Sequence, residues 1–498
     1  MVRLRRPLVT ALCIALAASL MGCDGADENG QTVSGQETTT PGVEQTTETE
    51  KTEETKISEE DEVKLEEVIE AFKLSQVEIS DAYSVNALDK EMDYLLAFDA
   101  DKLLAGFRDT AGIDMKGATR YAGWEDSLIG GHTMGHYLSA MAQAYVNTGI
   151  SEDDRAKVHE TMTYIIDELL VCQENSKGEP GFIFGATVLD YANVEFQFDN
   201  VEEGKCNITT QAWVPWYTMH KILAGIVEVY ELTGYEPALK LAVGLSDWVA
   251  GRTSTWDTAT AQKVRQIEFG GMNDVMYEMY ALTGNDAYAV SAHCFDHENI
   301  YKVVYADNEN ALDGKHANTT IPKFIGALNR YIACDGKVID GETVDASIYL
   351  EYAKSFWEMV VNKHTYVTGA NSEWEHFGMD YVLDAERTNA NNETCNVYNM
   401  LKLTRMLFEI TGDVKYADYY EAAYCNAILA SQNPETGMST YFQPMASGYF
   451  RVFGTRWTKF WCCTGTGMEN FTKLGDSIYF GSDESIYVNL YQSSTLRS

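Results

Sequence analysis

The stretch "PWYTMHKILAGIVEVYELTG", residues 215–234, combines the pattern of an amphipathic helix with a stop signal. Its apolar residues recur at spacings of three and four, as at Ile222, Ile226 and Val229, which is the period of one helix face. The run ends at Gly234, a residue that can adopt the left-handed conformation needed just beyond a helix C-terminus. The stretch therefore predicts one long helix that ends at a Thr-Gly cap.

The same ending recurs along the chain. At residues 145–149, 280–284 and 408–412, an aromatic residue is followed by Thr three positions later and by Gly four positions later. A weaker copy occupies 331–336. A second helical run follows each ending, for example "DVKYADYYEAAYCNAILASQ" from Asp413. Helix, cap and helix at intervals of roughly 50 residues or multiples of that predict an array of helical hairpins.

Such an array can be open, as in a solenoid, or closed into a ring of six hairpins. The loops between the hairpins are long and rich in Gly, His, Asn and Trp, which favours a ring with a functional mouth over a binding solenoid. We therefore predict an all-α barrel, an (α/α)6 toroid, over residues 61–480. The stretch "SIYFGSDESIYVNLY" alternates like strands and predicts a short β element at the C-terminal end, over 481–498.

The first residues predict export. Arg3, Arg5 and Arg6 precede an apolar run that is too short to span a bilayer, and the sequence "LMGC" ending at Cys23 resembles a bacterial lipobox. Residues 1–23 therefore predict a lipoprotein signal peptide with Cys23 as the lipidated residue, and the alternative is an ordinary secretory signal with a chance cysteine. Residues 24–60 are rich in Thr and Glu and predict a disordered tether.

Composition excludes some classes of partner. The chain has 498 residues, of which 45% are hydrophobic, so it can bury a large core. Its formal charge of −38 argues against nucleic acid and against attraction to anionic membranes, so we expect membrane contact only through the lipid anchor. The many aromatic residues suit a sugar-binding cleft, although they equally fill cores.

Polar residues gather where the predicted hairpins join. With aromatic residues beside them, they predict the lining of a cleft, although a lone histidine is often a core or capping residue. The motifs are "GHTMGHY" (131–137), "WVPWYTMHK" (213–221), "EFGGMND" (268–274), "HANTT" (316–320), "NSEWEHFG" (371–378) and "ETCN" (393–396).

Two adjacent cysteines in "FWCCTGTGMEN", residues 460–470, need an explanation, because a disulfide between neighbours in sequence is strained. Together with Glu393 and Cys395, they offer three thiolates and one carboxylate, a ligand set that suits tetrahedral Zn²⁺. The spacing is not that of a zinc ribbon, so buried or disulfide-bonded cysteines remain alternatives at this point.

A thiolate near a metal is also a candidate nucleophile, because the metal lowers its pKa. General acid–base catalysis would then need a carboxyl group. Glu373 and Glu375 lie in a Trp-containing, Gly-flanked loop, a setting in which a raised carboxyl pKa makes a general acid. The alternative for either glutamate is a solvated loop charge.

These motifs, in this order, resemble those of bacterial β-L-arabinofuranosidases of glycoside hydrolase family 127 and its relative family 146. The resemblance covers residues 85–491 and rests on strings such as "GHTMGHYLSAMAQAY", "FGGMNDVMYEMYALTGN", "HANTTIPKFIGALNRY", "NSEWEHFG" and "FWCCTGTGMEN". It implies an (α/α)6 barrel followed by β-sandwich domains, with a zinc ion held by one glutamate and three cysteines. The matching ligands are Glu393, Cys395, Cys462 and Cys463.

The resemblance also implies roles in a retaining hydrolysis. Cys462 matches the family's nucleophile and Glu375 its acid/base, with Glu373 as the fallback. A glycosyl-thioether would form on Cys462 and be released by water. The residues expected to contact substrate are His136, His220, His316, Trp216 and Glu373.

The expected function is therefore exo-acting release of β-L-arabinofuranose from plant-type glycans by an exported, lipid-anchored hydrolase. Two alternatives stay open: a glycosidase for another rare sugar, and a non-catalytic glycan-binding lipoprotein with a structural zinc. Because relatives continue beyond the barrel, residues 481–498 are expected to begin a truncated β-sandwich domain.

Overall fold

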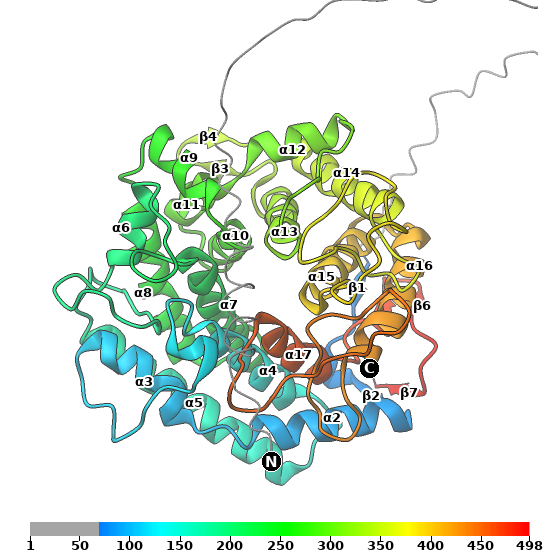
Figure 1. Cartoon of the computed structure of the whole chain (residues 1–498), viewed down its shortest axis with the longest axis horizontal. Helices are drawn as coiled ribbons and strands as arrows, with labels where there is room; N and C mark the ends of the chain where they lie inside the picture. The colour runs from blue at the N-terminus through cyan, green and yellow to red at the C-terminus, as the bar shows by residue number, and fades with distance from the viewer. Residues whose placement is uncertain (1–68, 498) are drawn as a thin grey trace, which may run out of the picture. The chain divides into compact units, whose positions relative to one another are not determined.

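Six helices form the inner ring of a closed barrel (Figure 1). The computed structural model describes residues 69–497, so the predicted signal peptide, Cys23 and the tether at 24–60 lie outside the described residues. Each inner helix packs on the next, and the last packs on the first. In ring order they are α4 (His132–Val146), α7 (Pro215–Thr233), α10 (Met272–Thr283), α13 (Ala317–Cys334), α15 (Thr394–Thr411) and α17 (Cys462–Thr472).

Five inner helices are each followed along the chain by an outer helix that packs on it. The outer helices are α5 (Glu152–Glu174), α8 (Glu236–Thr253), α11 (Asp286–Phe295), α14 (Ser347–Lys363) and α16 (Val414–Ala423). The sixth pair joins opposite ends of the described chain, because α2 (Ala82–Leu95) packs on α17, as the blue and orange-red helices of Figure 1 show. The predicted toroid of helical hairpins is confirmed, and the solenoid alternative is wrong.

Shorter elements fill the connections. The further α-helices are α3 (Ala100–Ala111), α6 (Phe196–Glu202), α9 (Thr258–Gln266) and α12 (Glu298–Tyr305). The single turns are Leu74–Gln76, Gly123–Asp126 and Leu429–Ser431, with a π-type turn at Tyr424–Ile428. Within residues 69–497, no helix is long and apolar enough to cross a membrane.

The predicted β element at the C-terminal end exists, and it pairs with strands near residue 70. The strands are β1 (Glu70–Ala71), β2 (Val77–Ile79), β3 (Val338–Ile339), β4 (Glu342–Thr343), β5 (Tyr479–Gly481), β6 (Ile486–Val488) and β7 (Ser494–Leu496). They form three antiparallel groups in the orders β1-β5-β6, β2-β7 and β3-β4. Both terminal groups therefore tie the start of the described chain to its end.

The glycine caps follow the prediction at three of the four clear repeats. Gly234, Gly284 and Gly412 have φ values of 69°, 68° and 64°, which is the left-handed region. The repeat at 145–149 differs, because α4 already ends at Val146. There Asn147 accepts from the Gly149 N–H (2.8 Å) and donates to the Thr472 carbonyl (2.8 Å), which replaces the glycine cap.

The inner helices α4 and α7 approach each other most closely at glycines. A Cβ on Gly135 would lie 1.9 Å from the Lys221 carbonyl oxygen, and one on Gly225 would lie 2.2 Å from the Gly135 carbonyl oxygen. Beside this contact, the barrel interior holds a cavity of about 690 Å³ that His136 and His220 line near the starts of their helices. The cavity continues to residues near the helix ends, such as Glu409 and Lys473.

Candidate active site and metal centre

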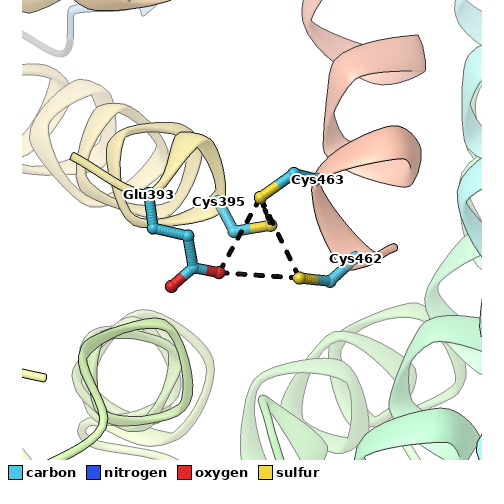
Figure 2. A group of neighbouring side chains, drawn as sticks. All are labelled: Glu393, Cys395, Cys462 and Cys463. Atoms are coloured by element: carbon cyan, nitrogen blue, oxygen red, sulfur yellow. Dashed lines mark hydrogen bonds between the residues drawn. The ribbon is translucent and has the colours of Figure 1, made fainter. Parts of the chain in front are cut away.

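Four acidic side chains from two inner helices meet in one buried cluster (Figure 2). Glu393 is the N-cap residue of α15 and Cys395 lies in its first turn, while Cys462 and Cys463 are the first two residues of α17. Their ligand atoms all lie within 4.8 Å of one another. Because α15 and α17 are neighbours in the ring, their starts bring together residues that are almost 70 positions apart.

The geometry of this cluster fits a tetrahedral metal ion. The Cys395 and Cys463 sulfurs are 3.2 Å apart, those of Cys462 and Cys463 are 3.9 Å apart, and Glu393 Oε1 lies 3.5 Å from the Cys462 sulfur. Sulfur ligands at about 2.3 Å from a tetrahedral zinc would be about 3.7 Å apart. All three cysteines are free thiols, so the disulfide alternative is wrong for them. Glu393 Oε2 is buried without a hydrogen-bond partner among the described residues, as expected of a metal ligand.

The pKa values of the four cluster residues also favour a bound cation. Burial raises the pKa values of Cys462, Cys463 and Glu393 above their ordinary values. Burial also opposes ionisation of Cys395, but hydrogen bonds from the two neighbouring thiols outweigh it and lower the pKa of Cys395 to about 7. Four buried acids at one point cannot all ionise unless positive charge is supplied, and Zn²⁺ would supply it.

A tyrosine hydroxyl links the cluster to the predicted acid/base. Tyr441 Oη lies 3.5 Å from the Cys462 sulfur and donates a short hydrogen bond to Glu375 Oε1. Cys462 and Glu375 touch the same hydroxyl, so they cannot be farther apart than the sum of these two contacts. Sequence analysis missed Tyr441, because nothing in its surroundings "STYFQP" sets it apart from other aromatic residues.

The loop that carries Glu375 has an unusual backbone. Ser372, Trp374 and Glu375 have positive φ values of 77°, 44° and 71°, a conformation that non-glycine residues rarely adopt. Backbone hydrogen bonds hold this loop, from Ala317 N–H to the Glu375 carbonyl (2.7 Å) and from Trp374 N–H to the Ala390 carbonyl (2.9 Å). Such strain is typical of functional sites, where the surrounding structure fixes a side chain in a required position.

Glu375 also faces His316, the N-cap residue of α13, and their closest side-chain atoms are 3.7 Å apart. Burial works against a charged His316, but the carboxylates of Glu268 and Glu375 outweigh it and raise the pKa of His316 to about 9. Burial would raise the pKa of Glu375, yet His316 and the Tyr441 hydrogen bond hold it below its ordinary value. The expectation of a raised Glu375 pKa is therefore wrong, because the sequence does not show that His316 and Tyr441 lie beside Glu375.

His136 is held by a carboxylate that sequence analysis did not identify. Its Nδ1 makes a short contact with Glu469, which also accepts from Tyr398 Oη. Burial lowers the pKa of His136 to about 4, while His136 itself and nearby lysines hold the pKa of Glu469 at about 2 despite its burial. A neutral His136 that donates from Nδ1 to an ionised Glu469 leaves Nε2 as a free acceptor, and Nε2 has no partner among the described residues.

His220 has the opposite arrangement. The Gly271 N–H donates to His220 Nδ1 (3.0 Å), and burial lowers the pKa of His220 well below its ordinary value. The neutral ring therefore carries its proton on Nε2 and can donate from it. The predicted histidines of α4 and α7 thus offer one acceptor and one donor along the same cavity.

Two predicted substrate residues lie elsewhere. Trp216 is 1% exposed and packs against Phe198, Trp248, Trp256 and Phe295, so its ring is core and is not open to a sugar. Trp216 therefore fits the alternative given for the aromatic residues, that they fill the core. Glu373 accepts a hydrogen bond from Thr388 Oγ1 (3.0 Å), and no contact with the cysteine cluster accompanies it among the described residues.

The start of α4 depends on a further residue that the sequence did not reveal. Glu125 accepts from the N–H groups of Gly131 (2.9 Å) and Thr133 (3.2 Å), so its carboxylate caps the helix that carries His132 and His136. Its position six residues before Gly131 does not match the ordinary capping spacing.

Solved structures share this fold. A structure described as a family 127 β-arabinofuranosidase has a TM-score of 0.62 and 17% identity, over 86% of this chain and 65% of its own. A family 127 β-L-arabinofuranosidase from Geobacillus stearothermophilus T6 has a TM-score of 0.61 and 15% identity, over 84% of this chain and 68% of its own. The chain thus spans about two thirds of the length of these relatives. No curated protein sequence matches it.

A family model extends the likeness from fold to sequence. The model for "β-L-arabinofuranosidase, GH127 catalytic domain" matches residues 76–476. The matched range contains the acid/base candidate Glu375 and all members of the Glu393, Cys395, Cys462 and Cys463 cluster. The chain belongs to the catalytic-domain family of glycoside hydrolase family 127.

Proposed function

We propose that this protein is a retaining, exo-acting glycoside hydrolase that releases β-L-arabinofuranose from plant-type glycans. One observation carries the proposal: the thiol of Cys462 and the carboxylate of Glu375 meet at the Tyr441 hydroxyl, directly beside a buried cluster of one glutamate and three cysteines. Retaining glycosidases place their two reacting groups about 5–5.5 Å apart, and the shared hydroxyl keeps these two groups close.

In the first step, the Cys462 sulfur attacks the anomeric carbon of the sugar. The bond from that carbon to the leaving oxygen breaks while Glu375 delivers a proton to the oxygen, and a glycosyl-thioether forms on Cys462. The proton would come from His316, whose Nε2 lies 3.7 Å from Glu375 Oε2.

In the second step, Glu375 takes a proton from a water molecule. The water oxygen attacks the anomeric carbon from the opposite side, the carbon–sulfur bond breaks, and the electron pair returns to Cys462. Two inversions at one carbon retain its configuration. Tyr441 can donate a hydrogen bond to either reacting group, and so it fixes their separation through both steps.

Glu393, Cys395, Cys462 and Cys463 are the residues that would hold a zinc ion. When bound, zinc would stabilise the sulfur as an anion, both as a nucleophile and as a leaving group. The thiols pack in a cluster with the apolar side chains of Ile129, Val214 and Tyr217, which lowers the polarity around the sulfur atoms.

The sugar itself would meet the two neutral histidines. His136 Nε2 accepts and His220 Nε2 donates, so together they can bind hydroxyl groups in both directions. A hydroxyl satisfies both roles, whereas a methyl group would leave both nitrogens unpaired. This pair supports recognition of a hydroxyl-rich sugar at the inner end of the site.

The test is release of arabinose from p-nitrophenyl β-L-arabinofuranoside by the purified protein, with metal content measured on the same sample. We expect turnover with about one zinc per chain and a loss of at least about a thousandfold in Cys462→Ala. Cys425→Ala is the matched control, because Cys425 is an exposed free thiol, and it should keep full activity.

Other outcomes separate the alternatives. Turnover only on a different glycoside would identify another rare sugar, and full activity in Cys462→Ala would refute the thiolate mechanism. A folded, zinc-loaded protein that binds glycans without any turnover would indicate a binding lipoprotein.

We also propose that the protein is exported and anchored to the bacterial membrane by a lipid on Cys23. The motif at 20–23 and the Thr- and Glu-rich segment after it support this placement. Cells fed a labelled fatty acid should label the wild-type protein, and Cys23→Ser should remain unlabelled. Equal labelling of both proteins would contradict the proposal.

A further inference from the structure

The residues next to Glu375 and Tyr441 form a second, outer pair. Trp374 precedes Glu375 and Phe442 follows Tyr441, and their ring centroids are 6.0 Å apart at 63°. The inner pair, Glu375 and Tyr441, contacts Cys462 through the tyrosine hydroxyl. Trp374 is 43% exposed and Phe442 is half-buried. The outer pair therefore borders the acid/base on its solvent side.

The backbone that carries the exposed indole is held in place, and the ring itself packs against Phe442. Trp374 donates its backbone N–H to the Ala390 carbonyl (2.9 Å), and its own carbonyl contacts His376 Nδ1 (2.6 Å). Its φ of 44° is a left-handed conformation that a tryptophan adopts only when the surrounding structure fixes it. An exposed aromatic ring that is already ordered binds a partner with little further loss of conformational entropy.

We propose that Trp374, supported by Phe442, forms the binding platform for the first leaving-group sugar and so determines specificity for glycosides with a sugar aglycone. The proposal rests on the proposed function, because it takes Glu375 as the group that protonates the glycosidic oxygen. That oxygen joins the released arabinose to the leaving group, so the leaving group must begin beside Glu375. Trp374 is the residue directly before Glu375, and its side chain is exposed to solvent.

The chemistry of the pair fits a sugar ring. The apolar C–H face of a sugar packs on an indole, and Phe442 packs against the indole in an edge-type contact at 63°. The Trp374 side chain is 43% exposed, and its indole N–H can donate to a hydroxyl group. A methyl aglycone would offer neither the apolar face nor the hydroxyl.

The experiment compares two substrates on the full protein: methyl β-L-arabinofuranoside and a disaccharide in which a second arabinofuranose replaces the methyl group. For Trp374→Ala we expect kcat/KM to fall about tenfold on the disaccharide and to change by less than about twofold on the methyl glycoside. Trp374→Phe should recover part of the loss. Tyr491→Ala removes an aromatic side chain that is 88% exposed, and it should leave both substrates unaffected.

Two results would overturn the platform. An equal fall on both substrates would mean that Trp374 only supports the Glu375 loop, and no change on either would mean that the indole does not touch the leaving group. If the wild-type protein cleaves neither substrate, the proposed function fails by itself. The platform is then tested by disaccharide binding in titration calorimetry, where equal affinity of wild type and Trp374→Ala would refute it and weaker binding by the variant would support it.

Discussion

In the proposed mechanism, Glu375 gives a proton in one step and takes one in the next, although its surroundings favour the ionised form. The partner that favours ionisation, His316, is also the nearest source of a proton, because the pKa of His316 is raised to about 9 by Glu268 and Glu375. The two residues therefore act as one acid that holds a single proton. That proton is present at neutral pH and is lost as pH rises through the pKa of His316.

A change at His316 should therefore alter the pH profile. In the wild-type protein, kcat/KM should fall above about pH 9, where the shared proton dissociates. In His316→Asn the acid is Glu375 alone, whose pKa lies below that of His316, so the falling limb should move down by about one pH unit or more. The measurement is kcat/KM against pH on the p-nitrophenyl glycoside.

His293→Asn is a suitable control, because His293 lies on the outer helix α11 and makes no contact with Glu375 within the part of the chain that the structure describes. Its profile should match that of the wild type. An unchanged limb in His316→Asn would show that the proton on Glu375 comes from another source.

At the scale of single residues, the sequence identified the ionisable residues of the site better than the residues that they contact. It brought together Glu393, Cys395, Cys462 and Cys463, because three thiolates and one carboxylate form a ligand set for zinc and because the family resemblance implies the same set. It did not find Tyr441, since an aromatic residue carries no mark of the group that its hydroxyl meets. Contacts of this kind depend on segments 66 and more residues apart, and no local spacing encodes them.

Among the elements, three inner helices, α13, α15 and α17, share one property: candidate site residues lie at their starts. Cys462 and Cys463 begin α17, Glu393 caps α15 and His316 caps α13. Because unpaired N–H groups and the helix dipole favour negative charge at such positions, helix starts are suited to thiolates and carboxylates. The barrel topology turns these separate helix starts into one site.

Close packing of α4 and α7 holds His136 and His220 at their depth in the barrel. Gly135→Ala should destabilise the protein by about 3 kcal/mol or more, because its Cβ would lie 1.9 Å from the Lys221 carbonyl oxygen and backbone cannot move aside cheaply. Thermal unfolding measures the effect, and activity should fall with it.

Gly251→Ala is the matched control on the outer helix α8. A Cβ there would meet no atom within 4 Å, so the substitution should be neutral or stabilise the helix by about 0.5–1 kcal/mol. If both variants unfold at the same temperature as the wild type, the glycine contact does not set the spacing of the two inner helices.

The repeats in the sequence predicted the helices well because periodicity and caps are local signals. The Thr-Gly endings at Gly234, Gly284 and Gly412 mark the ends of inner helices as expected. The sixth hairpin carried no such signal, because α2 and α17 come from opposite ends of the described chain. Ring closure is a property of the whole sequence and not of any repeat within it.

At the scale of the whole molecule, α2 closes the ring by packing on α17, and α2 carries a buried carboxyl group that makes stability depend on pH. Glu91 lies on α2 at 2% exposure, where its Oε2 accepts from Gln432 Nε2 (3.3 Å) and its Oε1 has no partner among the described residues. Burial raises the pKa of Glu91 to about 8, although Gln432 and Arg456 act in the opposite direction. A buried carboxyl group with so little compensation is stable only in its neutral form.

The sign of the effect on stability follows from proton binding. Between about pH 4.5 and 8 the folded protein keeps the Glu91 proton and the unfolded chain loses it, so the folded state binds more protons. The contribution of Glu91 to stability is therefore complete below about pH 4.5 and is lost as pH rises through about 8. The total loss is at most about 5 kcal/mol, at about 1.4 kcal/mol for each pH unit.

Glu91→Gln should remove this dependence, because the amide is neutral at every pH and keeps the shape of the carboxyl group. In urea unfolding, the variant and the wild type should be nearly equal near pH 5, and the variant should be the more stable by a few kcal/mol at pH 8.5. Glu152→Gln, at a side chain that is 88% exposed, should follow the wild type at each pH. A difference between Glu91→Gln and wild type that does not grow with pH would mean that Glu91 ionises freely in the folded protein, and that closure of the ring through α2 tolerates a buried charge.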